Sequence, residues 1–198
     1  YIINIMKQKK ILCLTDSFNS GGAQKQLMML ANGLVERNYE VATLQYYNLN
    51  FFSEYLDEKV VKFKEIHNNK ILRIIKILYR LFLYKPDCII SFLHGPNNYA
   101  ALYKLIFFWR KTLLITGERN LNVNALTLSD LLIRIPHIFA AKVVCNSNAQ
   151  KLRVDRFFKS KVLFIPNGTF IKNIVVKDNY KCKKENLKLI VPARFSFQ

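Results

Sequence analysis

Acidic residues are scarce in this chain of 198 residues, in which 13 Asp and Glu stand against 31 Lys and Arg and leave a formal net charge of +18. Such an imbalance favours anionic partners: nucleic acid, a membrane surface or phosphorylated small molecules. A compositional bias toward lysine would give the same charge, so charge alone identifies no partner. Nucleic acid is disfavoured, because no recognised binding motif accompanies the charge.

Cysteines are few, and none is paired in the sequence. The four residues show no CxxC spacing, and three of them lie in apolar runs: Cys13, Cys88 and Cys145, with Cys182 apart from them. A free cysteine in such a run behaves as a small hydrophobe. Disulfides and zinc are therefore not expected, and a reducing cytoplasm fits best.

Long hydrophobic runs are also missing. The longest candidates, Leu102–Trp109 and Ile74–Leu83, are interrupted by Lys or Arg and fall short of the ~20 apolar residues that span a bilayer. The hydrophobic fraction of 51% fits a folded protein. We expect a soluble or surface-bound chain and, because it begins with Tyr1, a piece of a longer protein.

What the sequence does contain is an alternation of short apolar runs with helical patterns. Strands are predicted at Lys10–Thr15, Glu40–Tyr46, Val60–Lys64, Cys88–Phe92, Thr112–Thr116, Lys142–Cys145 and Val162–Ile165. Helices are predicted at Gly22–Arg37, Lys70–Tyr84, Asn97–Trp109, Ala125–Ala140 and Asn148–Phe158. Asn38 is expected to stop the first helix in a left-handed conformation, and Pro136 to kink or break the fourth.

This alternation predicts parallel strands joined by crossover helices, hence a doubly wound, Rossmann-like α/β sheet. Ligands of such sheets bind at the carboxyl ends of the strands. Residues 1–168 are expected to form this domain, and 169–186 a basic linker without apolar periodicity. Residues 187–198 are expected to start the first strand of a second, truncated domain.

Two adjacent glycines, Gly21 and Gly22, separate the first predicted strand from the first helix. Backbone N–H groups at such a turn can point at a phosphate or sugar, and the helix amino end adds partial positive charge. The spaced GxGxxG set of dinucleotide enzymes is absent. No acidic residue ends the second strand, where Gln45 and Tyr46 stand instead, so a dinucleotide is disfavoured.

Six short motifs then follow in order: Gly-Gly-Ala-Gln at 21–24, Ser-Phe-Leu-His-Gly-Pro-Asn at 91–97, Thr-Gly-Glu-Arg-Asn at 116–120, Val-Val-Cys-Asn-Ser at 143–147, Ile-Pro-Asn-Gly at 165–168 and Val-Pro-Ala-Arg at 191–194. Together they resemble the N-terminal half of a family 4 glycosyltransferase of the GT-B fold. Pro192 and Ala193 depart from that pattern, since many members have a glycine before the arginine.

The resemblance implies a retaining enzyme that moves a sugar from a UDP- or GDP-sugar to a glycan or lipid-linked acceptor. It implies assembly of a bacterial surface polysaccharide, such as lipopolysaccharide or capsule, without a metal or prosthetic group. A GT-B sugar-nucleotide epimerase is an alternative, as is a non-catalytic basic α/β domain on an anionic membrane. The chain alone is expected to be inactive, because the other half of the donor site is absent from it.

The candidate site residues follow from the same motifs. Gly21, Gly22 and Arg194 are expected to face the donor diphosphate, and His94 and Glu118 to act in catalysis. The acceptor is expected to contact four residues: Asp16, Gln24, Arg119 and Asn120. Ordinary roles remain open for several of them: a turn for His94 and Asp16, and an ion pair closing a loop for Glu118 with Arg119. His67 and His137 are expected to be structural or solvent-facing.

The predicted helix over Lys70–Tyr84 also has two interpretations. Arg73, Lys76 and Arg80 share one face, and apolar residues lie largely opposite. Such a helix can lie on anionic lipid, or it can face the core and leave a basic face in solvent. We expect a cytoplasmic protein that can also bind peripherally to the inner face of the cell membrane.

Overall fold

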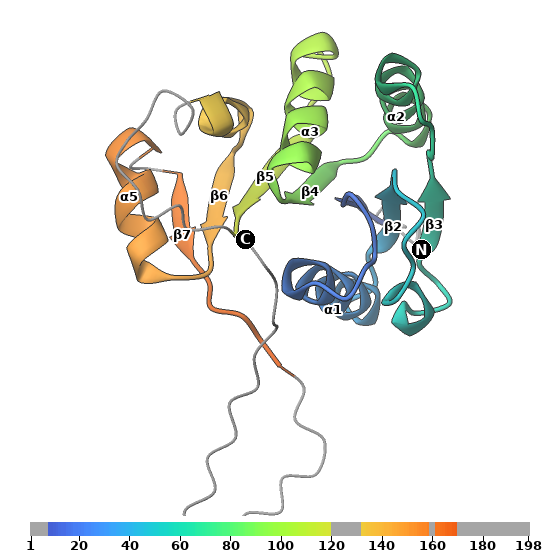
Figure 1. Ribbon diagram of the computed structural model, residues 1–198, viewed down its shortest axis with the longest axis horizontal. Coiled ribbons are helices and arrows are strands. Elements are labelled where there is room, and N and C mark those ends of the chain that lie inside the picture. Colours follow the sequence, from blue (N-terminus) through green and yellow to red (C-terminus); the bar gives the residue numbers. More distant parts are fainter. Residues whose placement is uncertain (1–7, 120–131, 159–160, 170–198) are drawn as a thin grey trace, which may run out of the picture. The chain divides into compact units, whose positions relative to one another are not determined.

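The computed structural model describes residues 8–119, 132–158 and 161–169. Within them seven strands form one parallel sheet in the order β3-β2-β1-β4-β5-β6-β7 (Figure 1). The strands are β1 (Lys10–Leu14), β2 (Glu40–Gln45), β3 (Val61–Lys64), β4 (Cys88–Phe92), β5 (Leu113–Glu118), β6 (Lys142–Cys145) and β7 (Val162–Phe164). The predicted doubly wound α/β fold is confirmed.

Helices connect the strands. The α-helices are α1 (Gly22–Glu36), α2 (Lys70–Tyr84), α3 (His94–Ile106) and α5 (Asn148–Phe158), and two short 3₁₀ helices are η1 (Ser53–Tyr55) and η2 (Ile135–Phe139). Figure 1 shows α1 on one side of the sheet and α2 and α3 on the other. All these elements belong to the first of two compact units, 1–168 and 169–198.

Strand β1 occupies the middle of the sheet and pairs with both β2 and β4. Leu12, for example, lies opposite Ala42 on one side and Ile89 on the other. The chain moves outward from β1 through β2 to β3, then crosses back to β4 and continues in the other direction. This reversal between β1 and β4 is where ligands of open α/β sheets bind.

Alternation along the strands builds a separate core on each face of the sheet. Cys13 packs with Leu27 and Ala31 of α1 on one face. Leu12 and Leu14 pack with residues of α2, α3 and α5 on the other, including Ile77, Tyr103 and Val154. Burial of a whole leucine side chain stabilises the folded state by about 1.5–3 kcal/mol. The two cores therefore hold the strands, and the loops at their carboxyl ends, in place.

The helix ends largely follow the sequence. Asn38 has φ 61°, which confirms the left-handed stop after α1. Pro136 lies in the first turn of η2, where a missing N–H costs nothing. Of the predicted helix over 125–140, residues 132–134 are α-helical and residues 135–139 form the 3₁₀ helix η2, while residues 125–131 lie outside the described ranges.

The orientation of α2 departs from the amphipathic prediction, although Lys76 is exposed and Leu81 is buried as expected. Arg73 is buried, with its guanidinium carbon 5.0 Å from the Tyr47 ring centre, and Arg80 bonds to Glu65 at 2.7 Å. The exposed side chains of α2 are instead mostly apolar, namely Ile71, Leu72, Ile75, Tyr79 and Leu83. None of the described helices is long and apolar enough to cross a membrane.

Candidate functional site

The loop between β1 and α1 is held together by two of the predicted site residues. Asp16 Oδ1 accepts hydrogen bonds from the Ser17 backbone N–H at 2.6 Å and from Gln24 Nε2 at 3.1 Å. The structure therefore brings Asp16 and Gln24 together, with each fixing the other. Their bond sets the path of the chain into α1, so both residues shape the loop.

The two glycines of this loop differ in their surroundings. A Cβ on Gly21 would lie 2.1 Å from Gln24 Oε1, whereas nothing lies within 4 Å of a Cβ on Gly22. Gly21 is the N-cap of α1, and among the described residues no side chain caps the helix. The first N–H groups of α1 therefore have no side-chain acceptor and are suited to an anion.

His94 lies in a tighter turn than the sequence predicts. The sequence predicts a turn at His94 before a helix that starts at Asn97, but α3 starts at His94 itself. The turn is made by Leu93, whose φ of 77° and ψ of 157° are a strained conformation for a residue with a side chain. His94 is exposed, and its Nε2 lies 3.2 Å from Asn98 Nδ2.

Gly95 and Asn97 explain why the chain can turn there. A Cβ on Gly95 would lie 2.5 Å from the Tyr46 hydroxyl, so only glycine fits the observed packing. Asn97 is buried, accepts a bond from Ser91 Oγ at 2.7 Å and donates to the Gly117 carbonyl at 3.2 Å. It ties α3 to β4 and β5 and fixes the start of the helix.

Glu118, at the end of β5, is held by a histidine that sequence reasoning did not select. His137 Nε2 lies 2.8 Å from Glu118 Oε2, and His137 Nδ1 lies 2.8 Å from Thr116 Oγ1. His137 is fully buried, and the Glu118 side chain keeps 11% of its surface exposed. Thr116, His137 and Glu118 thus form a buried hydrogen-bonded chain that ends at a partly open carboxylate.

His137 follows an apolar stretch with no glycine or polar loop beside it, so its sequence context gave no sign of this role. The available signal was a histidine in an apolar segment, since a buried imidazole requires partners for both ring nitrogens. The partners come from a strand about 20 positions earlier and are visible only in the fold.

Arg119 does not pair with Glu118 but lies over an aromatic ring. Its guanidinium carbon is 4.0 Å from the Phe92 ring centre, and Nη1 donates to Asn167 Oδ1 at 2.7 Å. A Cβ on Gly117 would lie 2.4 Å from the Phe92 ring, so this glycine makes room for the stack. Burial lowers the pKa of Arg119, and its Nε has no hydrogen-bond partner within the part of the chain that the structure describes.

Gly168 is fastened to α1 by the side chain of Gln26. Gln26 Nε2 donates to the Gly168 carbonyl at 2.6 Å, and the Gly168 N–H donates to Gln26 Oε1 at 3.1 Å. We call this pair of bonds the Gln26–Gly168 clasp. Together with the Arg119–Asn167 bond it fixes the segment after β7 against the first helix and the fifth strand.

These groups gather at one edge of the sheet. The loop with Gly22 follows β1, and His94 lies just after β4. Glu118 ends β5 and Arg119 follows it. The three strands β1, β4 and β5 are parallel neighbours. Asn120 and Arg194 lie outside the described residues. Within the described ranges, no three His, Cys, Asp or Glu side chains are grouped so as to hold a metal ion.

The doubly wound parallel sheet, with its strand order reversing between β1 and β4, defines a Rossmann-like domain. No protein-family model matches the sequence, and no curated protein is similar to it at the sequence level. Solved structures are similar in fold.

One is a glycosyltransferase from Rickettsia africae ESF-5, with a TM-score of 0.61 and 17% identity over 81% of this chain and 43% of that chain. Another is MurG from Acinetobacter baumannii, with a TM-score of 0.60 and 12% identity over 83% of this chain and 46% of that one. The chain therefore has a glycosyltransferase-like fold of the GT-B type and spans less than half the length of these two proteins.

Proposed function

We propose that this chain is the acceptor-binding domain of a glycosyltransferase that uses a nucleotide-sugar donor. The observation that carries the proposal is the uncapped amino end of α1, with open space around Gly22, on a sheet whose fold resembles that of a glycosyltransferase. A fold alone does not define an activity. The proposed donor and acceptor contacts therefore rest on the chemistry of the residues at the carboxyl ends of the strands.

Sugar transfer from a nucleotide sugar leaves a diphosphate, so the site has to stabilise growing negative charge. Fixed N–H groups and cations do this well in a site that excludes water. The N–H groups of the first turn of α1, around Gly22, supply such donors, and Arg194 is proposed to approach the diphosphate from the second domain. Arg119, held over Phe92, is proposed to bind an anionic group of the acceptor.

Glu118 is proposed to accept a hydrogen bond from the acceptor hydroxyl, because His137 fixes Oε2 and part of the carboxylate stays exposed. His94 is proposed to contact a hydroxyl or phosphate, and Asn120 the acceptor. The donor is a UDP- or GDP-sugar, the acceptor a glycan or lipid-linked glycan of a bacterial surface polysaccharide, and the transfer retains configuration without a metal. A sugar-nucleotide epimerase is the alternative.

The test uses the whole protein that contains this chain, with labelled UDP- and GDP-sugars and a membrane extract as acceptor. Gly22→Asp and Glu118→Gln are each expected to lower transfer by about tenfold or more. The first places a negative charge beside the proposed diphosphate site, and the second removes the charge of the carboxylate that is proposed to bind the acceptor hydroxyl. Glu36→Gln, an exposed change at the end of α1, is the control and should leave transfer unchanged. Undiminished transfer by both site variants, or transfer by residues 1–198 alone, would contradict the proposal.

We also propose that the domain binds an anionic membrane surface, because one specific surface favours it. The exposed apolar residues of α2 continue toward the end of α3 through the contact between the Phe82 and Phe107 rings, whose centres are 5.1 Å apart. Phe108 and Trp109 beyond α3 are 76% and 60% exposed. An apolar surface with interfacial aromatics, on a chain of net charge +18, suits anionic lipid.

Vesicle flotation separates this function from catalysis. A double variant, Ile75→Ser with Leu83→Ser, is expected to lose binding to vesicles of phosphatidylglycerol and phosphatidylcholine, while Leu152→Ser on α5, also exposed, keeps it. Raising the salt concentration should weaken binding without abolishing it. Equal binding to duplex or single-stranded DNA would show a charge effect alone and would overturn the membrane proposal.

A further inference from the structure

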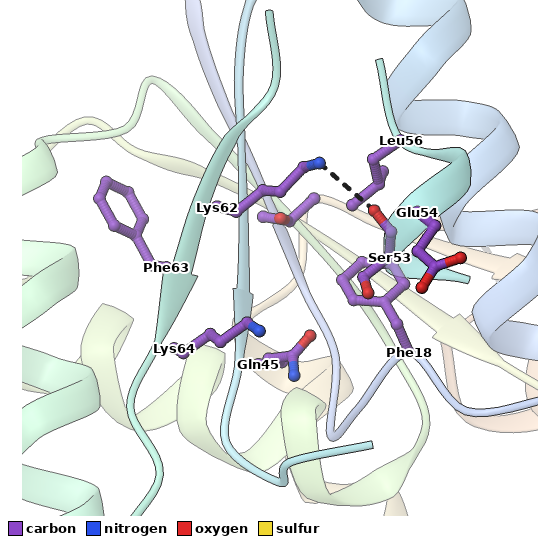
Figure 2. Close-up of a pocket in the computed structure, with 9 residues that line it drawn as sticks. Phe18, Gln45, Ser53, Glu54, Leu56, Lys62, Phe63 and Lys64 are labelled. Atoms are coloured by element: carbon purple, nitrogen blue, oxygen red, sulfur yellow. Dashed lines mark hydrogen bonds between the residues drawn. The ribbon is translucent and has the colours of Figure 1, made fainter. Parts of the chain in front are cut away.

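A pocket of about 280 Å³ lies between the ends of β2 and β3 and the helix η1, apart from the predicted site residues. Its walls come from four segments: Phe18 from the loop after β1, Thr43 and Gln45 from β2, Ser53 from η1, and Lys62 and Lys64 from β3. Figure 2 shows both lysine side chains directed to the same side of β3, with Phe63 directed away from them.

The face of β2 that meets this pocket changes character along its length. Val41, near the start of the strand, packs in the core under α1, whereas Thr43 and Gln45 on the same face are polar and only 2% exposed. Buried polar side chains are costly unless they have partners. Their position beside a pocket indicates a surface shaped for a polar ligand.

The pocket is rigid because its walls are bonded to one another. Gln45 Nε2 donates to the Tyr47 carbonyl at 3.0 Å and to Asn50 Oδ1 at 2.7 Å, which leaves its amide oxygen as the acceptor. The Phe52 N–H donates to the Phe18 carbonyl at 2.7 Å. Asn32 Nδ2 of α1 donates to the Tyr55 carbonyl at 2.8 Å, so η1 is fixed to α1. A ligand would meet a preformed site.

The charges of the lining favour an anion. Lys62 and Lys64 contribute two ammonium groups against the single carboxylate of Glu54. Lys62 Nζ lies 3.3 Å from the Ser53 carbonyl, a bond drawn in Figure 2, which holds it at the pocket edge. The Gln45 oxygen and the Ser53 carbonyl are acceptors for hydroxyl groups. The volume is close to the lower limit of about 300 Å³ for ligand sites, which suits one sugar ring.

We propose that this pocket binds a monosaccharide unit that carries a negative charge, either a phosphate or a carboxylate. Lys62 and Lys64 hold the anionic group, and Gln45 and the Ser53 carbonyl hold ring hydroxyls. The inference rests on the proposed function only in assigning this ligand to the acceptor glycan. The pocket would then select an anionic sugar of that acceptor, at a distance from the transfer site.

The test follows backbone amide signals of isotope-labelled residues 1–198 by NMR while four probes are added separately: glucose 6-phosphate, glucuronate, glucose and inorganic phosphate. One or both anionic sugars should shift the signals of Gln45, Lys62 and Lys64, and should bind more tightly than glucose or phosphate. Glucose 6-phosphate alone would identify a phosphorylated sugar, and glucuronate alone a sugar acid.

Lys62→Gln and Lys64→Gln should each weaken the binding by about tenfold, with the spectrum otherwise unchanged because both side chains are exposed. Lys9→Gln, an exposed lysine before β1, removes the same charge away from the pocket and should have no effect. Absence of shifts at the pocket, equal binding of phosphate alone, or an equal loss with Lys9→Gln would overturn the proposal.

No sugar transfer is measured in this experiment, so its failure leaves the transferase proposal standing. Conversely, the pocket proposal survives if the whole protein binds these sugars but transfers none, and only the transferase assignment then fails.

Discussion

The imidazole of His137 has no access to solvent, so its two ring nitrogens depend entirely on Thr116 and Glu118. If the Thr116 hydroxyl donates to Nδ1, a neutral imidazole can donate from Nε2 to the Glu118 carboxylate. The chain of bonds then limits the rotation of the carboxylate. A catalytic or binding role of Glu118 would thus depend on a residue that touches no ligand.

Removing this imidazole should destabilise the protein. His137→Ala leaves the partly exposed Glu118 carboxylate and the buried Thr116 hydroxyl without their partner, and we expect a loss of about 2–4 kcal/mol in the free energy of unfolding. His94→Ala, which alters an exposed histidine, should change it by less than about 0.5 kcal/mol. Urea unfolding of residues 1–198 measures both; equal losses would show that the bonds of His137 do not contribute.

The two adjacent glycines should respond differently to alanine. Gly22→Ala adds a methyl group in open space at the first helical position, and should stabilise the protein by about 0.5–1 kcal/mol. Gly21→Ala displaces the Gln24 side chain and breaks its bond to Asp16, a loss of about 1 kcal/mol. Thermal unfolding checks the order, and a Gly22→Ala variant less stable than Gly21→Ala would contradict it.

Sequence reasoning placed residues at strand ends correctly but could not pair them. Asp16 and Gln24 were both expected to contact the acceptor, and the structure shows them bonded to each other. Glu118 and Arg119 were expected either to bind ligand or to pair, yet each has a different partner. Pairing depends on side-chain direction and on distant segments, which a single sequence does not encode locally.

Helix α2 shows why a helix was easy to predict and its buried face was not. Apolar residues surround most of its circumference, so several faces compete for the core. The face of α2 that is buried includes Arg73. Tyr99 accepts a hydrogen bond from Arg73 Nε at 3.3 Å, and the rings of Tyr46 and Tyr47 flank the guanidinium group. These partners come from the loop after β2 and from α3, and none is visible in the sequence of α2.

The end of α2 offers a direct test of backbone strain. Lys85 adopts a left-handed conformation with φ 55° and ψ 60°, which is about 1–2 kcal/mol less favourable for most residues than for glycine. Lys85→Gly should therefore raise the free energy of unfolding by about 1 kcal/mol. Asn38→Gly is the matched control: asparagine tolerates its φ of 61° and should gain less. Denaturant unfolding measures both, and an equal or larger gain at Asn38 would contradict the argument.

The whole sheet could be predicted because its signal is repeated. Seven short apolar runs separated by helical patterns leave few topologies open, since crossovers between parallel strands are right-handed. The register, the pocket beside β3 and the buried chain through His137 could not be predicted. They depend on contacts between segments far apart in the sequence, such as Phe18 with Phe52 or Thr116 with His137.

Both cores of the sheet contain thiols that can report on the integrity of the fold. Burial raises the pKa of Cys13 and Cys145 to about 12 and that of Cys88 to about 11, so all three remain neutral and unreactive at mildly alkaline pH. In a Cys182→Ser variant, the native chain should react negligibly with Ellman's reagent. After denaturation, all three remaining thiols should react. Rapid reaction of Cys13 or Cys145 in the native chain would contradict their burial, whereas Cys88 is only partly buried.

The Gln26–Gly168 clasp joins positions 142 residues apart, which gives it a place in the order of folding. Closing so long a loop has an entropic cost that two hydrogen bonds cannot offset alone. The clasp can therefore persist only after the strands between its ends have assembled. The path of the chain at Gly168 is therefore fixed late in folding, after the sheet has formed.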